Sequence, residues 1–256
     1  MLPFALTSAA QFQPAAPAQF PENEYYREVE AVRRLSARLT DRDKVIAEYW
    51  ADGPATETPA GHWSLLAQFV SRRDSHTADD DVVMFFALSN ALLDASIAVW
   101  DCKLTYDYVR PVSAVRFVYA DRSIEAWGGP YQGTRVIRGE DFRSYIATPP
   151  FPEYTSGHSA FSAASAEILK SFTGNPRFGA SVTFLRGAST IEPGAVPASD
   201  VTLAWRTFDD AADEAGLSRR IGGIHFRHGD LESRQMGKQI GKQAWAKALE
   251  YLNGVR

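Results

Sequence analysis

The sequence predicts an all-α protein that forms a single helical-bundle domain with at most a minor β-hairpin. Apolar residues recur every three or four positions over most of the chain, which places them on one face of successive helices. The 256 residues contain no internal repeat and no linker between two bodies, so one domain is expected. Residues 1–21 include the proline-rich stretch QFQPAAPAQFP and are expected to form an extended arm, with the helical domain spanning residues 22–256.

The first half of the helical domain is predicted to contain four helices. Three are expected over Glu22–Leu39, Asp41–Trp50 and Gly61–Arg73. Thr77 and Asp80 form a capping-box pattern at the start of a longer helix that ends near Asp101. This apolar segment is almost long enough to span a membrane, but burying its Asp94 in a bilayer would cost about 3 kcal/mol. We therefore interpret it as a buried central helix and expect no membrane span.

The second half is predicted to contain three helices and a hairpin. Ser156–Phe172 is rich in alanine and serine, so neighbouring helices can approach it closely. The segments Ser181–Leu185 and Val201–Trp205 are predicted to pair as a short hairpin. Two helices over Trp205–Gly216 and Asp230–Leu252 close the chain. The last carries small residues at helical spacing, namely Gly237, Gly241, Ala244 and Ala248.

Composition and motif content exclude several functional classes. With 45% hydrophobic and 23% charged residues the chain is globular, and its net charge of −4 argues against a nucleic-acid partner. The single cysteine, Cys102, excludes an intrachain disulfide and a cysteine-based zinc or redox motif. The first residues, MLPFALTSAAQF, lack the basic region of a signal peptide, so no cleavable signal is expected. The sequence also lacks a glycine-rich phosphate loop and a GxSxG elbow.

Three separated segments carry basic or anion-binding groups in this otherwise acidic chain. They are DCKLTYDYVRP at residues 101–111, PPFPEYTSGH at 149–158 and LSRRIGGIH at 217–225. Together they supply the candidate site residues Lys103, Arg110, Ser156, Gly157, His158, Arg219 and His225. Taken singly, such a lysine or arginine is usually a solvated surface charge, and such a histidine is usually structural. Their joint spacing is what indicates a site.

The middle segment predicts an anion site at the start of a helix. Its prolines stiffen a loop that runs into Ser156-Gly157-His158, where free amides and the helix dipole favour an anion. Three cations around the same point would match a tetrahedral oxyanion such as phosphate or vanadate. The three candidates are Lys103, Arg110 and Arg219.

These motifs resemble those of the vanadium-dependent haloperoxidases and the soluble acid phosphatases of the type 2 phosphatidic acid phosphatase superfamily. The shared pattern is K-x6-RP, then (P)SGH, then SR-x5-H-x3-D. Further phrases such as DGPATETPAGHW and GGIHFRHGDLESRQMG are similar to the bacterial haloperoxidase-like branch. The resemblance runs from Leu6 to the C-terminus, and it implies an α-helical bundle of the haloperoxidase and acid phosphatase type, with an oxyanion cradled at its centre.

The resemblance also implies a cofactor and its cage. Lys103, Arg110 and Arg219 would hold the equatorial oxygens of vanadate, and phosphate can occupy the same site. The Ser156 hydroxyl and the Gly157 amide would complete the cage.

Two histidines receive different roles from the resemblance. His225 would be the only protein ligand of the metal or, in a phosphatase, the nucleophile toward phosphorus. His158 would be the acid–base catalyst on the opposite side, titrating near neutral pH. The aspartate that the pattern places four residues after the ligand histidine is absent, because Gly229 stands there and Asp230 follows. The candidates for orienting His225 are Asp230, Asp94 and Asp101.

Other positions near the motifs are also interpreted from the sequence. Thr155 stands where proline is common before SGH. Phe151 occupies a place that holds phenylalanine in fungal chloroperoxidases, which favours bromide oxidation and leaves chloride open. His62 is interpreted as a hydrogen-bonded structural histidine, with the site entrance as the alternative. For His228 a substrate contact and solvent exposure stay equally open.

The leading functional hypothesis is a vanadate-dependent haloperoxidase that uses hydrogen peroxide, a halide and a small organic acceptor. The alternative is a soluble acid phosphatase that hydrolyses phosphomonoesters through a phosphohistidine at His225. A third hypothesis is a non-catalytic helical interaction protein, against which the seven intact motif positions argue. Homo-oligomerisation is left open by the sequence.

Overall fold

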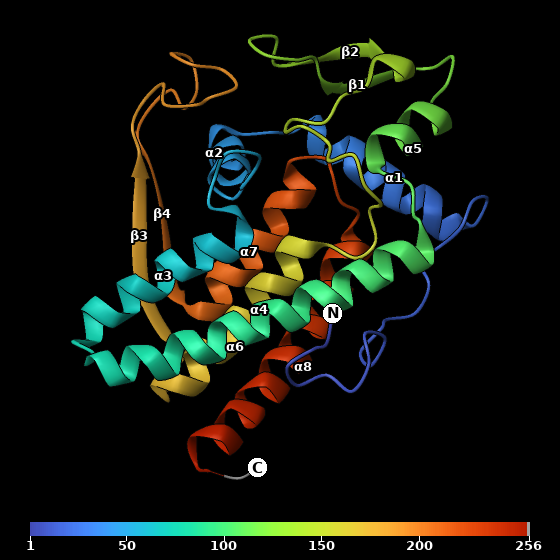
Figure 1. Ribbon diagram of the computed structural model, residues 1–256. Helices are drawn as coiled ribbons and strands as arrows, with labels where there is room; N and C mark the ends of the chain where they lie inside the picture. The colour runs from blue at the N-terminus through green and yellow to red at the C-terminus, as the bar shows by residue number, and fades with distance from the viewer. Residues whose placement is uncertain (255–256) are drawn as a thin grey trace.

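The computed structural model describes residues 1–254, which contain eight α-helices and two antiparallel hairpins (Figure 1). The helices are α1 Asn23–Ser36, α2 Asp41–Tyr49, α3 Thr58–Asp74, α4 Ala78–Tyr106, α5 Pro111–Val118, α6 Gly157–Thr173, α7 Phe208–Ile221 and α8 Arg227–Leu252. One hairpin pairs β1 Ser123–Trp127 with β2 Thr134–Arg138, and the other pairs β3 Arg177–Phe184 with β4 Val201–Thr207. A short 3-10 turn follows β2 at Gly139–Asp141.

The predominantly helical class is confirmed, and every predicted helix overlaps a helix of the structure. The predicted hairpin is β3–β4, and the capping box at Thr77 is present at the start of α4. The division into an arm over 1–21 and a domain over 22–256 stays a prediction, and its last two residues, 255–256, lie outside the described residues.

Three short elements were not predicted, namely α5 and the two strands of the β1–β2 hairpin. Helix α5 has only eight residues, too few for a sustained helical period, although Pro111 at its first position is a typical start signal. Strand β2 is exposed along nearly its whole length, so its sequence shows no alternation between buried and exposed positions.

Helix α6 lies at the centre of the bundle and contacts α8, α7, α4 and α3 (Figure 1). Its backbone touches α8 directly, as the small residues predict. A Cβ atom at Gly237 would lie 2.3 Å from the carbonyl oxygen of Ala160, and one at Gly241 would lie 2.8 Å from that of Ala164. The contacts follow the same order along both helices, so α6 and α8 run parallel and their N-terminal ends lie side by side.

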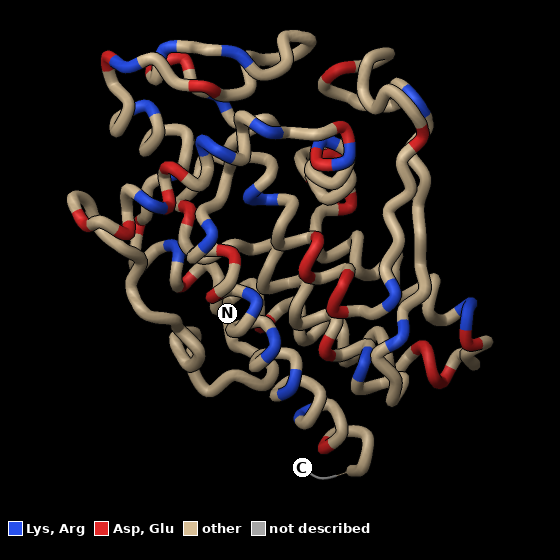
Figure 2. Tube along the Cα trace, turned by 180° about the vertical axis from the view of Figure 1, so that it is seen from behind, with Lys and Arg blue, Asp and Glu red and all other residues tan. Residues whose placement is uncertain are grey.

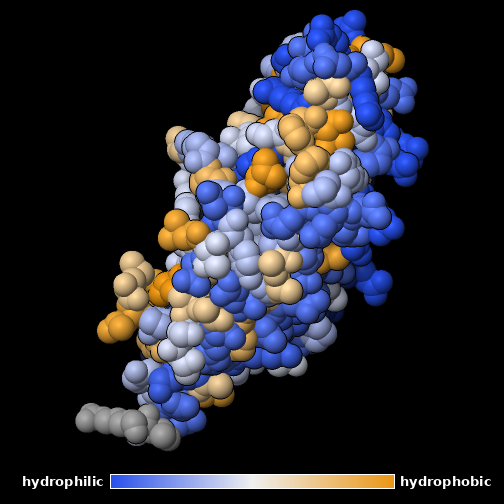
Figure 3. All heavy atoms as spheres, turned by 90° about the vertical axis from the view of Figure 1, so that its right-hand side faces the viewer, coloured by the Kyte–Doolittle hydropathy of each residue, from blue (hydrophilic) through white to orange (hydrophobic). Residues whose placement is uncertain are grey.

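The apolar core surrounds this helix pair and extends to the β3–β4 hairpin. Trp50, Trp63, Phe178 and Phe208 are almost completely buried in it, and the Trp63 indole donates to Ser162 Oγ at 2.7 Å. Charged residues of both signs are interspersed along the chain (Figure 2). On the face shown in Figure 3, apolar side chains lie in small groups among hydrophilic ones.

The long helix α4 crosses the molecule beside α6 and α8. Within residues 1–254, the segment Ala78–Val118 is the one stretch long and apolar enough to cross a membrane by length and composition alone. Half of its most apolar window is buried inside the protein. The expectation that the chain has no membrane span stays a prediction.

Asp94, near the middle of α4, anchors the N-terminal arm. Its carboxylate is fully buried and accepts the amides of Phe4, Ala5 and Leu6 at 2.6, 2.8 and 3.3 Å. Asp94 therefore holds the first residues of the arm, while the hydroxyls of Tyr106 and Tyr154 hold it further along by donating to the carbonyls of Pro14 and Ala15.

Replacing this carboxylate should release the arm and destabilise the bundle. Because hydrogen bonds to a charged group contribute about 1.5–3 kcal/mol each and the freed amides of the arm can bind water instead, Asp94→Ala should lower the free energy of unfolding by at least about 3 kcal/mol. Urea unfolding measures the loss, and amide hydrogen exchange at residues 4–6 should become fast. Asp101→Ala, two turns along α4, is the matched control, because the Asp101 carboxylate makes no side-chain hydrogen bond to residues 1–254. Equal losses in both variants would contradict the anchoring role.

Candidate functional site

A cavity of about 490 Å³ opens beside the N-terminal end of α6. Five of the predicted site residues line it, namely Lys103, Gly157, His158, Arg219 and His225. The two others adjoin it. Arg110 places its guanidinium NH1 3.1 Å from His225 Nε2, and Ser156 caps α6 by accepting the amide of Ser159 at 3.3 Å. The structure thus brings all seven predicted residues, from three distant segments, into one place.

Lys103 and Arg110 hold the loop that precedes α6. Lys103 Nζ, in the last turn of α4, donates to the carbonyls of Pro152 and Glu153 at 2.7 and 3.0 Å. Arg110 Nε, at the start of α5, donates to the carbonyl of Phe151 at 2.8 Å. The Phe151 ring centroid lies 5.2 Å from Lys103 Nζ and 4.9 Å from Arg110 Cζ, so one aromatic face contacts both cations.

Arg219 enters the cavity from the last turn of α7. Its NH1 donates to the carbonyl of Trp50 at 2.6 Å, which fixes the segment after α2. Its Nε is buried and has no hydrogen-bond partner among the residues that the structure describes. An arginine donor left without an acceptor in a buried site is available to an incoming anion.

Burial is the main cause of the lowered pKa values of the cations at this cavity. It lowers the pKa of Arg110 to about 10 and that of Arg219 to about 9, values at which both guanidinium groups stay protonated at neutral pH. Burial first, and then the charge of Arg110, lowers the pKa of Lys103. An anion in the cavity would oppose both effects, because it supplies the negative charge that buried cations lack.

His225 follows α7 and is buried between two partners. Its Nδ1 lies 2.6 Å from Glu153 Oε1, and its Nε2 accepts from Arg110 NH1 at 3.1 Å. This pairing requires the proton on Nδ1 and leaves the lone pair on Nε2. Burial, followed by Arg110 and Lys103, holds the pKa of His225 well below its usual value, so the imidazole is neutral. The His225 side chain is only 4% exposed, so its replacement must be checked for an effect on folding.

The carboxylate that contacts His225 is that of Glu153, and the expectation that Asp230, Asp94 or Asp101 does so is wrong. Asp230 instead accepts from Ser159 Oγ at 2.8 Å and from Arg234 Nε at 2.7 Å. Asp94 binds the N-terminal arm, and Asp101 makes no hydrogen bond to His225. Glu153 stands in the segment PPFPEYTSGH, but a contact between residues 72 positions apart leaves no trace in spacing.

His158, in the first turn of α6, lines the cavity. Its Nε2 lies 3.6 Å from Asp52 Oδ2, too far for a hydrogen bond, and is buried without a partner among residues 1–254. Burial, followed by the charge of Arg219, holds the pKa of His158 well below its usual value. The expectation of titration near neutral pH is therefore not met while no anion balances these cations.

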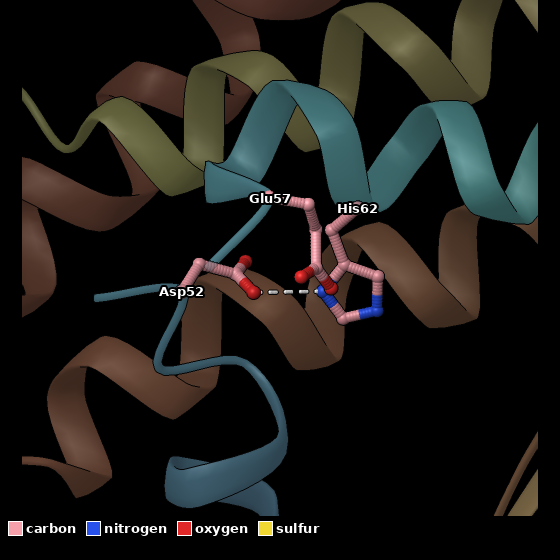
Figure 4. Close-up of side chains that lie close together, drawn as sticks. All are labelled: Asp52, Glu57 and His62. Atoms are coloured by element: carbon pink, nitrogen blue, oxygen red, sulfur yellow. Dashed lines mark hydrogen bonds and ion pairs between the residues drawn. The ribbon is translucent and has the colours of Figure 1, made fainter. Parts of the chain in front are cut away.

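Asp52 was not singled out from the sequence, although it belongs to the phrase DGPATETPAGHW. Its other oxygen, Oδ1, lies 2.9 Å from His62 Nδ1, as the dashed line in Figure 4 shows. Asp52, Glu57 and His62 present ligand atoms within 4.8 Å of one another, and the hydrogen bond between Asp52 and His62 explains most of this proximity. Asp52 thus stands between two histidines, one of them in the cavity.

The remaining predicted positions fall into place around the cavity. His62 is buried, stacks on Trp50 at 4.8 Å and is absent from the cavity lining, in agreement with the structural interpretation. His228 is half-buried beside Tyr154 and is also absent from the lining. Phe151 lines the cavity, and Ser159 bonds to Ser156 and Asp230 rather than to His158.

Comparison with known protein families shows which family this chain belongs to. Residues 83–254, about two thirds of the chain, match the family described as the VCPO second helical-bundle domain. The chain belongs to this family. The matched range contains all seven candidate site residues.

Relatives of known structure and activity support the family assignment. The vanadium chloroperoxidase of Curvularia inaequalis is 30% identical over 100 residues, which cover 39% of this chain and 16% of that protein. Two structures of a bacterial vanadium-dependent chloroperoxidase, holo and apo, share 27% identity with TM-scores of 0.84 and 0.88. A bacterial vanadium-dependent iodoperoxidase shares 28% identity with a TM-score of 0.75. Each of these three structural matches covers 96% of this chain and 53–55% of the solved chain. The chain therefore spans about half the length of these solved relatives.

The neutral, buried state of His158 predicts a specific pH dependence of stability. Below pH 6.5 the unfolded chain takes up a proton on this imidazole and the folded chain does not, so stability falls as the pH falls. The free energy of unfolding of the wild type, minus that of His158→Gln, should drop by about 1 kcal/mol between pH 6.5 and 5.5. Saturating phosphate should reduce this drop, because a bound anion raises the pKa of His158. Urea unfolding at each pH measures it, and parallel profiles for the two proteins would contradict the assignment.

Proposed function

We propose that this chain carries the active site of a vanadate-dependent haloperoxidase, which oxidises halide with hydrogen peroxide and halogenates a small organic acceptor. The observation that carries the proposal is the cavity itself. Three buried cations meet there beside a neutral histidine whose Nε2 lone pair is not protonated. Because the chain spans about half the length of its solved relatives, the activity is proposed for the site rather than inherited from a whole enzyme.

The donor set fits a tetrahedral oxyanion such as vanadate. Arg219 Nε is a buried donor without an acceptor within residues 1–254. Lys103 Nζ donates to two carbonyls, which leaves the third of its protons for a ligand. The amides of Gly157 and His158, in the first turn of α6, have no preceding helical carbonyl to bond. Such a surplus of donors over acceptors favours an anion.

Each residue would have a definable task at this site. Lys103, Arg110 and Arg219 would hold the oxygens of the anion, helped by the Gly157 amide and the Ser156 hydroxyl. His225 Nε2 would be the ligand atom, held toward the cavity by the contact on Nδ1. Bound vanadate would activate peroxide as a Lewis acid, and the oxidation state of vanadium would not change.

His158 would move protons on the other side of the anion. Its neutral Nε2 has no partner in residues 1–254 and is therefore able to accept a proton. Asp52 Oδ2, 3.6 Å away, would stabilise the imidazolium that forms. The negative charge of a bound oxyanion would raise the pKa of His158 toward the range useful for this task.

The wall formed by Phe151 bears on halide choice. Its ring covers Lys103 and Arg110 and makes that side of the cavity apolar, which strengthens the field of both cations by excluding water. We therefore expect turnover of iodide and bromide and leave chloride open.

The test is to add orthovanadate to the purified chain and to assay halogenation and phosphomonoester hydrolysis in parallel. We expect peroxide-dependent oxidation of iodide and bromide that requires vanadate and that phosphate suppresses, because both ions fill one cage. His225→Ala should abolish stoichiometric vanadate binding and keep phosphate binding. His158→Ala should keep the ion and lose turnover by about 10²-fold or more, the usual contribution of a positioned acid–base group.

The controls separate loss of the site from loss of the fold. Because His225 is buried against Glu153, circular dichroism and thermal unfolding of each variant must show a folded protein at the assay temperature. Phosphomonoester hydrolysis without any halide oxidation would identify the acid phosphatase alternative. Neither activity, with no binding of vanadate or phosphate, would leave a non-catalytic helical protein and end the proposal.

A further inference from the structure

We propose that Glu153 is the positioning residue of His225. Its carboxylate occupies the space that a side chain at position 229 would otherwise fill. The inference rests on the proposed function only in taking His225 as the ligand of the anion. The question is how this chain orients His225 when position 229, where the motif places an aspartate, carries glycine.

The carboxylate of Glu153 makes two contacts through one oxygen. Oε1 lies 2.6 Å from His225 Nδ1 and accepts the amide of Phe226 at 3.1 Å. The group is fully buried, and its other oxygen has no hydrogen-bond partner among residues 1–254. Both contacts are directed at the residues just before α8, although Glu153 belongs to the loop before α6.

These two contacts are those that an acidic residue in the first turn of α8 would make. Phe226 is the N-cap of α8, so Gly229 is its third helical residue. In a capping box the acidic side chain at that third position accepts the amide of the N-cap residue. Here the Phe226 side chain offers no cap, and the carboxylate that accepts its amide comes from Glu153.

The space beside position 229 can hold the carboxylate of Glu153 or a side chain of residue 229, but not both. A Cβ atom at Gly229 would lie 2.3 Å from Glu153 Oε1 and 2.9 Å from Oε2. No side chain can occupy position 229 while Glu153 keeps its place, and Gly229 is not required for its own backbone, since its φ is not positive. Glycine at this position therefore serves to admit the carboxylate.

Placing the carboxylate on the loop also joins the two halves of the cage. The carbonyl of Glu153 accepts from Lys103 Nζ at 3.0 Å, and its amide donates to the carbonyl of Tyr108 at 2.9 Å. The same residue thus fixes the loop to Lys103 through its backbone and fixes His225 through its side chain.

The experiment relocates the carboxylate between the two positions. The variants are Glu153→Ala, Gly229→Asp, the double variant Glu153→Ala/Gly229→Asp, and the matched double control Glu153→Ala/Gly229→Ala. The control fills the space with a methyl group but supplies no carboxylate. Orthovanadate and phosphate affinities are measured separately by calorimetry, and the protonated ring nitrogen of His225 is identified by ¹⁵N NMR without any added ion.

Glu153→Ala should weaken orthovanadate binding by about 10- to 100-fold, as is usual when the partner of a metal-ligating histidine is removed. Phosphate affinity should not fall, because phosphate is held by the cations and does not need the Nε2 lone pair. The fraction of the Nδ1-protonated form of His225 should fall, because only the Arg110 NH1 contact on Nε2 then favours it. Gly229→Asp should also bind vanadate weakly, because its side chain collides with Glu153.

The decisive comparison is between the two double variants. Glu153→Ala/Gly229→Asp should regain at least tenfold in vanadate affinity over Glu153→Ala/Gly229→Ala and should restore the Nδ1-protonated form. Equal behaviour of the two would overturn the proposal, and so would an equal loss of phosphate and vanadate affinity in Glu153→Ala, which would indicate collapse of the loop. If the wild type binds no vanadate, the proposed function fails, and the NMR comparison still decides the role of Glu153.

Discussion

Three positive charges are buried around one cavity, and the surrounding structure is organised by the need to offset their repulsion. Lys103, Arg110 and Arg219 each donate to backbone carbonyls of segments that contain no regular structure. Those hydrogen bonds recover part of the solvation that burial removes, and they simultaneously shape the loop before α6 and the segment after α2. Glu153 and Asp52 lie nearby, but burial raises the pKa of Glu153 to about 7, and Arg219 Nε is left without an acceptor among residues 1–254. The proposed oxyanion would supply the negative charge that these buried cations lack.

The close approach of α6 and α8 determines where the two histidines lie. Gly237 and Gly241 allow the backbones to touch, and the parallel course of the two helices brings their N-terminal ends to the same side of the bundle. The amide of Ser156 donates to Ser233 Oγ at 2.7 Å, which ties the start of α6 to the first turns of α8. His158 and His225 consequently reach the cavity from neighbouring helix ends. His158 Nε2 has no hydrogen-bond partner among residues 1–254, and His225 Nε2 is covered by Arg110.

The sequence predicted the helices and the cage residues but not the groups that support them. Local signals, such as the period of apolar residues and the capping box at Thr77, depend on neighbours in the chain and so are visible in the sequence. The seven candidate residues that the structure brings together were found because they stand in short motifs with fixed spacing. Glu153 and Asp52 act across 72 and 106 positions, and only folding reveals such contacts. The one available signal was the glycine at position 229, where a carboxylate was expected, and its meaning became clear only when the space beside it was found to hold Glu153.

The central claim is that this cavity is a preformed oxyanion cage in which Arg110 covers the ligand atom of His225. A crystal structure of the chain grown with orthovanadate tests it most directly. The account predicts the anion within hydrogen-bond distance of Lys103, Arg219 Nε and the Gly157 amide, with Arg110 NH1 turned from His225 Nε2 to an anion oxygen and Glu153 still on Nδ1. An anion bound elsewhere, or His225 Nε2 still bonded to Arg110 with vanadate in the cavity, would contradict it.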